Sequence, residues 1–201
     1  LVRALTDYNH PQSFGSRLRA KRITLLLTLI DAALQRRKSV RILDLGGTRT
    51  YWGVVAPEIL AARKVTITVL NLPGRIRERD DARFRFVEGD ACNLSAYDNN
   101  VFDIVHSNSV IEHVGDHSRM EAFAREIRRL APAYFVQTPN YWFPIEPHFF
   151  CLRFHWLPET WRAGLLARTG LGQYTRAAST EDALRAVRGI RQSRPIRRRP
   201  L

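Results

Sequence analysis

The alternation of strand-like and helical segments constrains the fold of this chain more than any other feature. Five short apolar stretches, most of them closed by turn-forming residues, are predicted strands: residues 39–45, 65–72, 84–90, 101–108 and 133–139. Helical patterns lie before or between them, at 17–36, 54–62 and 118–131. Strands that alternate with helices at this spacing predict a Rossmann-like, doubly wound α/β fold: a mainly parallel sheet with helices on both faces.

The helix predicted at 118–131 has the clearest start signal. Ser118 is the predicted N-cap, and Glu121 stands three residues later, where a capping box has its acidic member. We therefore expect this helix to begin at Ser118.

The length of 201 residues allows one domain with a substantial core. We expect this single domain to cover 1–190, with three parts: an N-terminal helical or lid segment (1–38), a cofactor-binding core (39–139), and an aromatic loop with helices at 159–168 and 179–190 (140–190). The arginine-rich tail 191–201 is expected to be disordered. No stretch after the fifth strand has a convincing strand pattern, so strands 6 and 7 of a seven-stranded sheet are expected to be missing.

The net charge of +13 is concentrated at the two ends of the chain. Residues 1–39 hold eight basic residues against two acidic ones, and residues 188–201 hold six arginines and no acid. We favour solvated arms over a phosphate-binding role for these ends. No apolar run reaches the length of a membrane span, and no cleaved leader is expected. The two cysteines, Cys92 and Cys151, lack metal-type spacing, which is typical of a protein of the reducing cytoplasm.

The first predicted strand ends in Asp44-Leu45-Gly46-Gly47, at the edge where doubly wound sheets bind ligands. Glycines let the backbone adopt a positive φ and approach a ligand closely. A dinucleotide site would require Gly-x-Gly-x-x-Gly, and a phosphate loop would require Gly-Lys-Ser/Thr; neither pattern is present. Two interpretations stay open: a binding loop whose carboxylate accepts hydrogen bonds from an amine, or an ordinary strand closed by a tight turn.

Four motifs in order resemble the class I S-adenosylmethionine-dependent methyltransferases, especially the small bacterial type with a C-terminal aromatic loop. They are ILDLGG (42–47), VEGDA (87–91), FDIVHSNSVIEHVGD (102–116) and YFVQTPN (134–140). The resemblance implies an enzyme that uses S-adenosylmethionine as its cofactor and transfers a methyl group to a small-molecule acceptor, with oxygen as the favoured target atom.

The resemblance also implies which residues hold the methionine end of the cofactor. Asp44 would receive the methionine amine, and Gly46 and Gly47 would give the backbone room beside the methionine and ribose. Ser107 and Asn108 end the fourth predicted strand, where the reactive methyl group would point toward the acceptor.

The nucleoside end would lie against the second and third strands. Asn71 ends the second strand, where the family usually has a carboxylate that binds the ribose hydroxyls. Asp90 would face the adenine amino group, with Ala91 supplying backbone contact. Thr48 and Arg49 replace the glycines that are usual in the family, so we expect a stiffer loop.

An oxygen acceptor can require a base to remove its proton, and the candidates are His113, His148, Glu146 and Glu112. The alternatives are that His113 packs beneath the loop as a helix residue, and that Glu146 and His148 brace a proline-rich loop. Glu112 and His113 match the second half of the Glu-x-x-Glu-His metal motif that small-RNA 2′-O-methyltransferases and ubiquinone-type O-methyltransferases use. Ser109 stands in place of the first glutamate, and we predict no metal site.

Tyr141 and Trp142 follow the fifth predicted strand, on the side where an acceptor would enter. We expect them to line a pocket for a planar or amphipathic acceptor, the alternative being that they pack in the core. Two rival functions stay open. One is an RNA methyltransferase, suggested by the basic ends and the partial metal motif; the other is a catalytically silent module that binds S-adenosylmethionine without turnover.

Overall fold

The computed structural model describes residues 14–138, 145–146, 151–152 and 154–169. The chain divides into two compact units, which are described separately. The first unit is the chain up to Val110 together with Asp116–Gln137, and the second is Ile111–Gly115 together with the chain from Thr138. The prediction of one domain over 1–190 stays a prediction.

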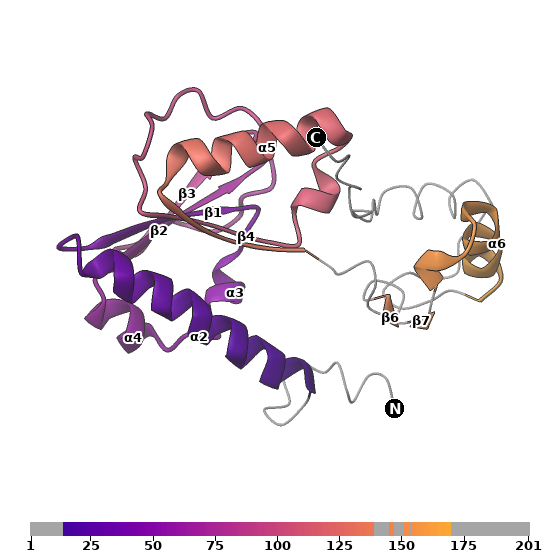
Figure 1. Ribbon diagram of the computed structural model, residues 1–201, viewed down its shortest axis with the longest axis horizontal. Helices are drawn as coiled ribbons and strands as arrows, with labels where there is room; N and C mark the ends of the chain where they lie inside the picture. The colour runs from indigo at the N-terminus through magenta and orange to yellow at the C-terminus, as the bar shows by residue number, and fades with distance from the viewer. Residues whose placement is uncertain (1–13, 139–144, 147–150, 153, 170–201) are drawn as a thin grey trace, which may run out of the picture. The chain divides into compact units, whose positions relative to one another are not determined.

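The first unit is built on a five-stranded parallel sheet (Figure 1). Its strands are β1 (Val40–Leu45), β2 (Val65–Asn71), β3 (Phe84–Glu88), β4 (Ile104–Asn108) and β5 (Ala133–Gln137). They lie in the order β3-β2-β1-β4-β5, so β1 is central and the strand order reverses between β1 and β4. The predicted Rossmann-like, doubly wound fold is confirmed.

Helices cover both faces of this sheet (Figure 1). On one face lie α2 (Phe14–Leu34), α3 (Arg49–Trp52) and α4 (Pro57–Ala62), and on the other lies α5 (His117–Leu130). The buried side chains of α2 and α5 recur three or four residues apart, which is the spacing of one helix face: Ile23, Leu26 and Ile30 in α2, and Phe123, Ile127 and Leu130 in α5.

The start of α5 differs from the sequence prediction. Asp116, and not Ser118, is the N-cap: its carboxylate accepts a hydrogen bond from the backbone N–H of Arg119 at 3.0 Å. The hydroxyl of Ser118 donates to the same carboxylate at 2.7 Å. Aspartate and serine are comparable N-caps, and here the helix extends to the earlier of the two.

The crossover from β2 to β3, residues 72–83, has no helix, although parallel strands are usually joined by one. Side chains of this crossover instead bond to the outer edge of β3. The Asp81 carboxylate accepts from the backbone N–H of Phe84 at 2.8 Å, and the Asp80 carboxylate accepts from that of Phe86 at 2.8 Å. The segment before β3 therefore covers the backbone edge that an outermost strand otherwise exposes.

Arg49, at the start of α3, fixes the crossover to this helix. Its guanidinium pairs with the Asp81 carboxylate and donates to the carbonyl of Arg79 at 2.7 Å. The backbone N–H of Arg49 donates to Glu78 Oε1 at 3.1 Å. Thr48, the N-cap of α3, accepts from the N–H of Tyr51 at 3.3 Å. Thr48 and Arg49 therefore have structural roles at the positions where the methyltransferases that the chain resembles usually have glycine.

The pKa of Asp81 gives this connection a pH dependence. The Arg49 guanidinium, and then the backbone N–H groups of Phe84 and Arg83, lower the pKa of Asp81 from 3.8 to about 2. Because the folded pKa lies below the unfolded one, the stabilisation is complete above the unfolded pKa and is lost as the pH falls through about 2.

We therefore expect Asp81→Asn to unfold at a lower temperature than the parent protein, by a margin that is constant above about pH 5 and shrinks steadily toward pH 2. Thermal unfolding of the two proteins across this pH range checks it. A margin that is unchanged at the acidic end would contradict the assigned ion pair.

The second unit contains η1 (Ile111–His113), the two-stranded antiparallel pair β6 (Ile145–Glu146) and β7 (Cys151–Leu152), η2 (Phe154–Trp156) and α6 (Glu159–Thr169). The helix predicted at 159–168 corresponds to α6, whereas the helix predicted at 179–190 and the tail 191–201 lie outside the described residues. In the part of the chain that the structure describes, β6 and β7 are separate from the parallel sheet. None of the described helices has both the length and the apolar character that crossing a membrane requires.

Candidate functional site

Asp44 lies at the end of the central strand with its side chain buried among other residues of the first unit. Parallel pairing sets Asp44 opposite Val69 of β2 on one side and His106 of β4 on the other. Residues opposite each other in neighbouring strands project to the same face of the sheet. For Asp44 this face is the one covered by α3, and its side chain is 0% exposed.

Both oxygens of the Asp44 carboxylate are hydrogen-bonded. Trp52 Nε1 of α3 donates to Oδ2 at 2.7 Å, and His106 Nδ1 lies 2.6 Å from Oδ1. Because a carboxylate accepts, Nδ1 carries the proton that faces Asp44, and Nε2 lies 3.2 Å from the hydroxyl of Tyr51. These hydrogen bonds form one network of Asp44, Trp52 and His106, which are buried, and Tyr51, which is partly buried. Hydrogen bonds to a charged group in such surroundings are strong.

The two glycines after β1 are packed closely. Gly46 has a φ of +69°, and a Cβ at its position would lie 2.6 Å from Val110 Cγ2. A Cβ on Gly47 would lie 1.8 Å from Asp44 Oδ2. The turn therefore requires glycine at both positions, at Gly47 because the backbone passes directly over the buried carboxylate.

Asn71 lies beside this turn. Its Nδ2 donates to the carbonyl oxygen of Gly47 at 2.9 Å, which ties the end of β2 to the turn after β1. A carboxylate at this position could not donate that hydrogen bond, and its oxygen would face the carbonyl oxygen. The side-chain amide therefore has a physical reason where the family pattern has an acid.

Asp90 follows β3 and forms an ion pair with α5. Its two oxygens each accept from Arg119 Nη2 at 2.8 Å, and Oδ1 also accepts from the backbone N–H of Cys92 at 2.9 Å. The Arg119 hydrogen bond is the main reason that the pKa of Asp90 lies below its ordinary value. Ala91, which lies between Asp90 and Cys92 in the sequence, is partly buried.

Ser107 and Asn108 end β4 as predicted. The Ser107 side chain is 0% exposed, and its hydroxyl donates to the carbonyl of Leu45 at 3.2 Å, which joins β4 to β1. Asn108 is partly buried. The structure thus brings Asp44, Gly47 and Asn71 together. It also holds Ser107 against Leu45, the residue of β1 that follows Asp44.

The catalytic candidates belong to the second unit. His113 is exposed at the end of η1. Its neighbour Glu112 is 2% exposed; Oε2 accepts from the hydroxyl of Thr138 at 3.1 Å, and Oε1 has no hydrogen-bond partner among the described residues. Glu146 lies in β6, but its side chain is not described. His148, Tyr141 and Trp142 lie outside the described residues. Across the described ranges, no three His, Cys, Asp or Glu side chains gather as metal ligands do.

Sequence reasoning did not single out Tyr51, Trp52 and His106. One signal for His106 was available. In a doubly wound sheet β1 and β4 are neighbours, so a polar residue two positions before the end of β4 lies opposite the penultimate residue of β1, which here is Asp44. Trp52 and Tyr51 carried no such signal, because the turn after β1 determines where α3 places them.

The sheet, with a glycine turn after its central strand, places the chain among the doubly wound α/β proteins. Residues 57–132 match the sequence family described as "Methyltransferase domain". This part of the chain is therefore similar to methyltransferase domains, the class of protein that the sequence motifs resemble. The matched range includes Asn71, Asp90, Ala91, Ser107 and Asn108; it begins after Asp44 and the two glycines. No curated protein matches the sequence.

Solved structures of limited similarity were also found. A protein described as a methyltransferase from an antibiotic biosynthesis pathway of Anabaena variabilis is 20% identical, with a TM-score of 0.47 over 73% of this chain and 61% of that one. PigF with SAH is 18% identical, with a TM-score of 0.36 over 92% and 67% of the two chains. An O-methyltransferase family protein from Burkholderia thailandensis is 12% identical, with a TM-score of 0.35 over 92% and 57%. The chain thus spans 57–67% of the length of these proteins.

Proposed function

We propose that this chain binds S-adenosylmethionine at the carboxyl ends of β1–β3 and transfers its methyl group to a small-molecule acceptor, with oxygen as the target atom. The observation that carries the proposal is the convergence of Asp44, Gly47 and Asn71 at the carboxyl ends of β1 and β2. Asn71 Nδ2 lies 2.9 Å from the carbonyl oxygen of Gly47, and Gly47 lies directly over the Asp44 carboxylate. The family match over residues 57–132 supports it independently.

The chemistry of these residues fits the cofactor. Asp44 would accept from the methionine ammonium, the Asn71 amide oxygen would accept from a ribose hydroxyl, and Asp90 would accept from the adenine amino group. A carboxylate has about four lone-pair sites, so Asp44 and Asp90 keep acceptor capacity beyond their present partners. Because Asp44 is 0% exposed, direct contact with an ammonium requires Gly47 to move away from its carboxylate.

Bound S-adenosylmethionine supplies an already activated methyl group, so the task of the protein is mainly alignment of donor and acceptor. Ser107 and Asn108 would line the space beside the methyl group. His113, His148 and Glu146 are proposed as bases for the acceptor hydroxyl, and Tyr141 and Trp142 as walls of the acceptor pocket.

A module that binds the cofactor without turnover is the second candidate. The observation that favours it is that the proposed polar contacts are already engaged inside the first unit: Asp44 with Trp52 and His106, Asn71 with Gly47, and Asp90 with Arg119. Polar groups that already bond to one another can stabilise the loops of the protein itself without binding a ligand.

Two measurements on the full chain distinguish these functions. Titration calorimetry with S-adenosylmethionine and with its demethylated product is expected to show binding of both. Methyl transfer from radiolabelled cofactor to a panel of phenols, alcohols and carboxylic acids is expected to give a labelled product for at least one acceptor class. Binding without any labelled product would favour the silent module, and no binding of either compound would refute both functions.

A further inference from the structure

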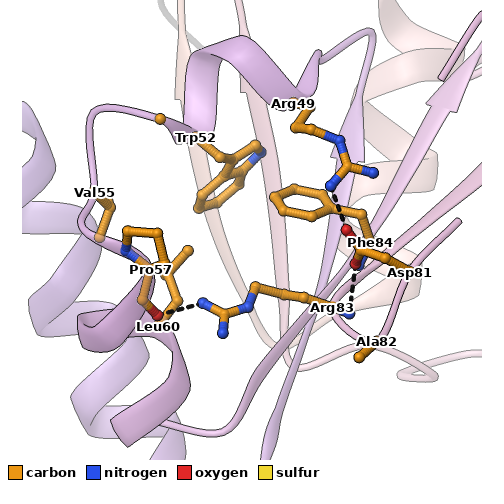
Figure 2. A pocket seen from close by; sticks show the side chains of 10 residues that line it. Arg49, Trp52, Val55, Pro57, Leu60, Asp81, Ala82, Arg83 and Phe84 are labelled. Atoms are coloured by element: carbon orange, nitrogen blue, oxygen red, sulfur yellow. Dashed lines mark hydrogen bonds and ion pairs between the residues drawn. The ribbon is translucent and has the colours of Figure 1, made fainter. Parts of the chain in front are cut away.

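A cavity of about 460 Å³ lies on the α3–α4 side of the sheet, beneath the crossover 72–83 (Figure 2). Most of its wall is apolar and comes from Trp52, Val55, Pro57, Leu60 and Phe84. It lies apart from the proposed cofactor contacts at Asn71 and Asp90, because Phe84 begins β3 whereas those residues end β2 and follow β3. Cavities of this volume, with apolar walls and a few polar groups, are typical of small-molecule sites.

The irregular crossover explains why this space is not filled by the protein itself. In a doubly wound sheet, a helix between β2 and β3 normally packs against the strands it connects. Here the crossover contains no helix, and the Arg49 guanidinium lies 4.6 Å from the centre of the Phe84 ring (Figure 2). Trp52, Leu60 and Phe84 are themselves buried, so a planar apolar group that enters the cavity would transfer mainly its own surface from water to this apolar wall.

The charged groups around the cavity favour an anion. The cavity is lined by two guanidinium groups, those of Arg49 and Arg83, and by one carboxylate, that of Asp81. Asp81 is already neutralised by Arg49 and accepts from the backbone N–H groups of Arg83 and Phe84 at 2.7 and 2.8 Å. Among the residues that the structure describes, no carboxylate pairs with the Arg83 guanidinium.

Arg83 has the donors that an anion requires. Its Nη1 donates to the carbonyl of Pro57 at 2.5 Å, which holds the guanidinium across the cavity mouth toward α4 (Figure 2). Its Nε and Nη2 have no acceptor among the described residues. Adjacent guanidinium donors match the two oxygens of a carboxylate.

We infer that this cavity binds a small planar monoanion, an aromatic carboxylate, whose ring packs against Trp52, Leu60 and Phe84 and whose carboxylate pairs with Nε and Nη2 of Arg83. Trp52 links this site to the turn after β1, because the same indole donates its N–H to Asp44. The indole N–H is therefore a reporter for occupancy of the cavity.

Naphthoate is a suitable probe, and naphthamide is its uncharged counterpart. Calorimetry on the full chain is expected to give at least tenfold tighter binding for naphthoate, with a shift of the Trp52 indole N–H signal in proton–nitrogen NMR spectra. That signal is assigned by its loss in Trp52→Phe. Equal binding of the two compounds, or no binding of naphthoate at millimolar concentration, would overturn the inference without any variant.

Arg83→Gln tests the assigned partner. Arg85→Gln is the matched control, since Arg85 is an exposed arginine of β3, two residues after Arg83, and does not line the cavity. We expect at least tenfold weaker naphthoate binding for the first and less than a twofold change for the second. Equal losses would mean that the anion responds only to the general positive charge of the chain. If Arg83→Gln does not fold, the comparison of naphthoate with naphthamide on the parent chain decides whether the cavity binds an anion. No arm uses S-adenosylmethionine, so this inference and the proposed function can fail separately.

Discussion

Asp44→Asn is expected to weaken S-adenosylmethionine binding roughly tenfold or more, because a hydrogen bond from an ammonium to a charged acceptor contributes about 1.5–3 kcal/mol. The fold should tolerate this change. The asparagine oxygen can face Trp52 Nε1, and its amide can donate to His106 Nδ1, provided that the imidazole moves its proton to Nε2 and donates to Tyr51. Calorimetry with the cofactor measures the first effect, and urea unfolding measures the second.

Asp44→Ala is the matched comparison and should behave differently. It leaves the donors of Trp52 and His106 without an acceptor in a site that is 0% exposed, and it creates a void. Loss of about 2–4 kcal/mol of unfolding free energy is the expected result. Should Asp44→Asn fold normally and bind the cofactor as tightly as the parent, the methionine amine does not lie at Asp44.

Gly47→Ala is expected to destabilise the first unit by about 3 kcal/mol, the upper part of the usual range for overpacking. The reason is direct: the added Cβ would lie 1.8 Å from Asp44 Oδ2, and that carboxylate cannot move away without breaking its bonds to Trp52 and His106. Chemical denaturation followed by far-ultraviolet circular dichroism measures the loss.

Gly74→Ala provides the control for Gly47→Ala. Gly74 also lies in a turn, with a φ of +75°, but an added Cβ there meets nothing within 4 Å. Only backbone strain remains, at about 1–2 kcal/mol. Comparable losses in the two variants would show that steric conflict with the Asp44 carboxylate is not what requires glycine at position 47.

The fold was predictable because the strands are short runs rich in apolar and β-branched residues, and because helical spacing occurs before β1, between β1 and β2, and between β4 and β5. All five strands lie within the predicted ranges, with differences confined to their ends. The glycine turn after β1 was predictable for the same reason, since it marks where the central strand ends. Helix starts were less certain, because Asp116 and Ser118 are both good N-caps and only the three-dimensional course of the chain selects one.

The partners of the site residues were not predictable. Which side chain faces Asp44 depends on the register between β1 and β4, two strands that lie about 60 residues apart and become neighbours only in the folded sheet. The partner of Asn71 depends on the path of the turn after β1, and that of Asp90 on how α5 packs. Sequence motifs therefore located candidate residues, whereas the hydrogen bonds that engage them are properties of the assembled sheet.

The carboxylates of Asp80 and Asp81, which accept the outward amides of Phe86 and Phe84, have a consequence for solution behaviour. Another polypeptide that approached this side in extended conformation would find those two donors occupied and would meet negative charge first. Fibril growth or strand exchange through this side would require residues 80 and 81 to detach beforehand, and acid that protonates Asp81 would promote that detachment.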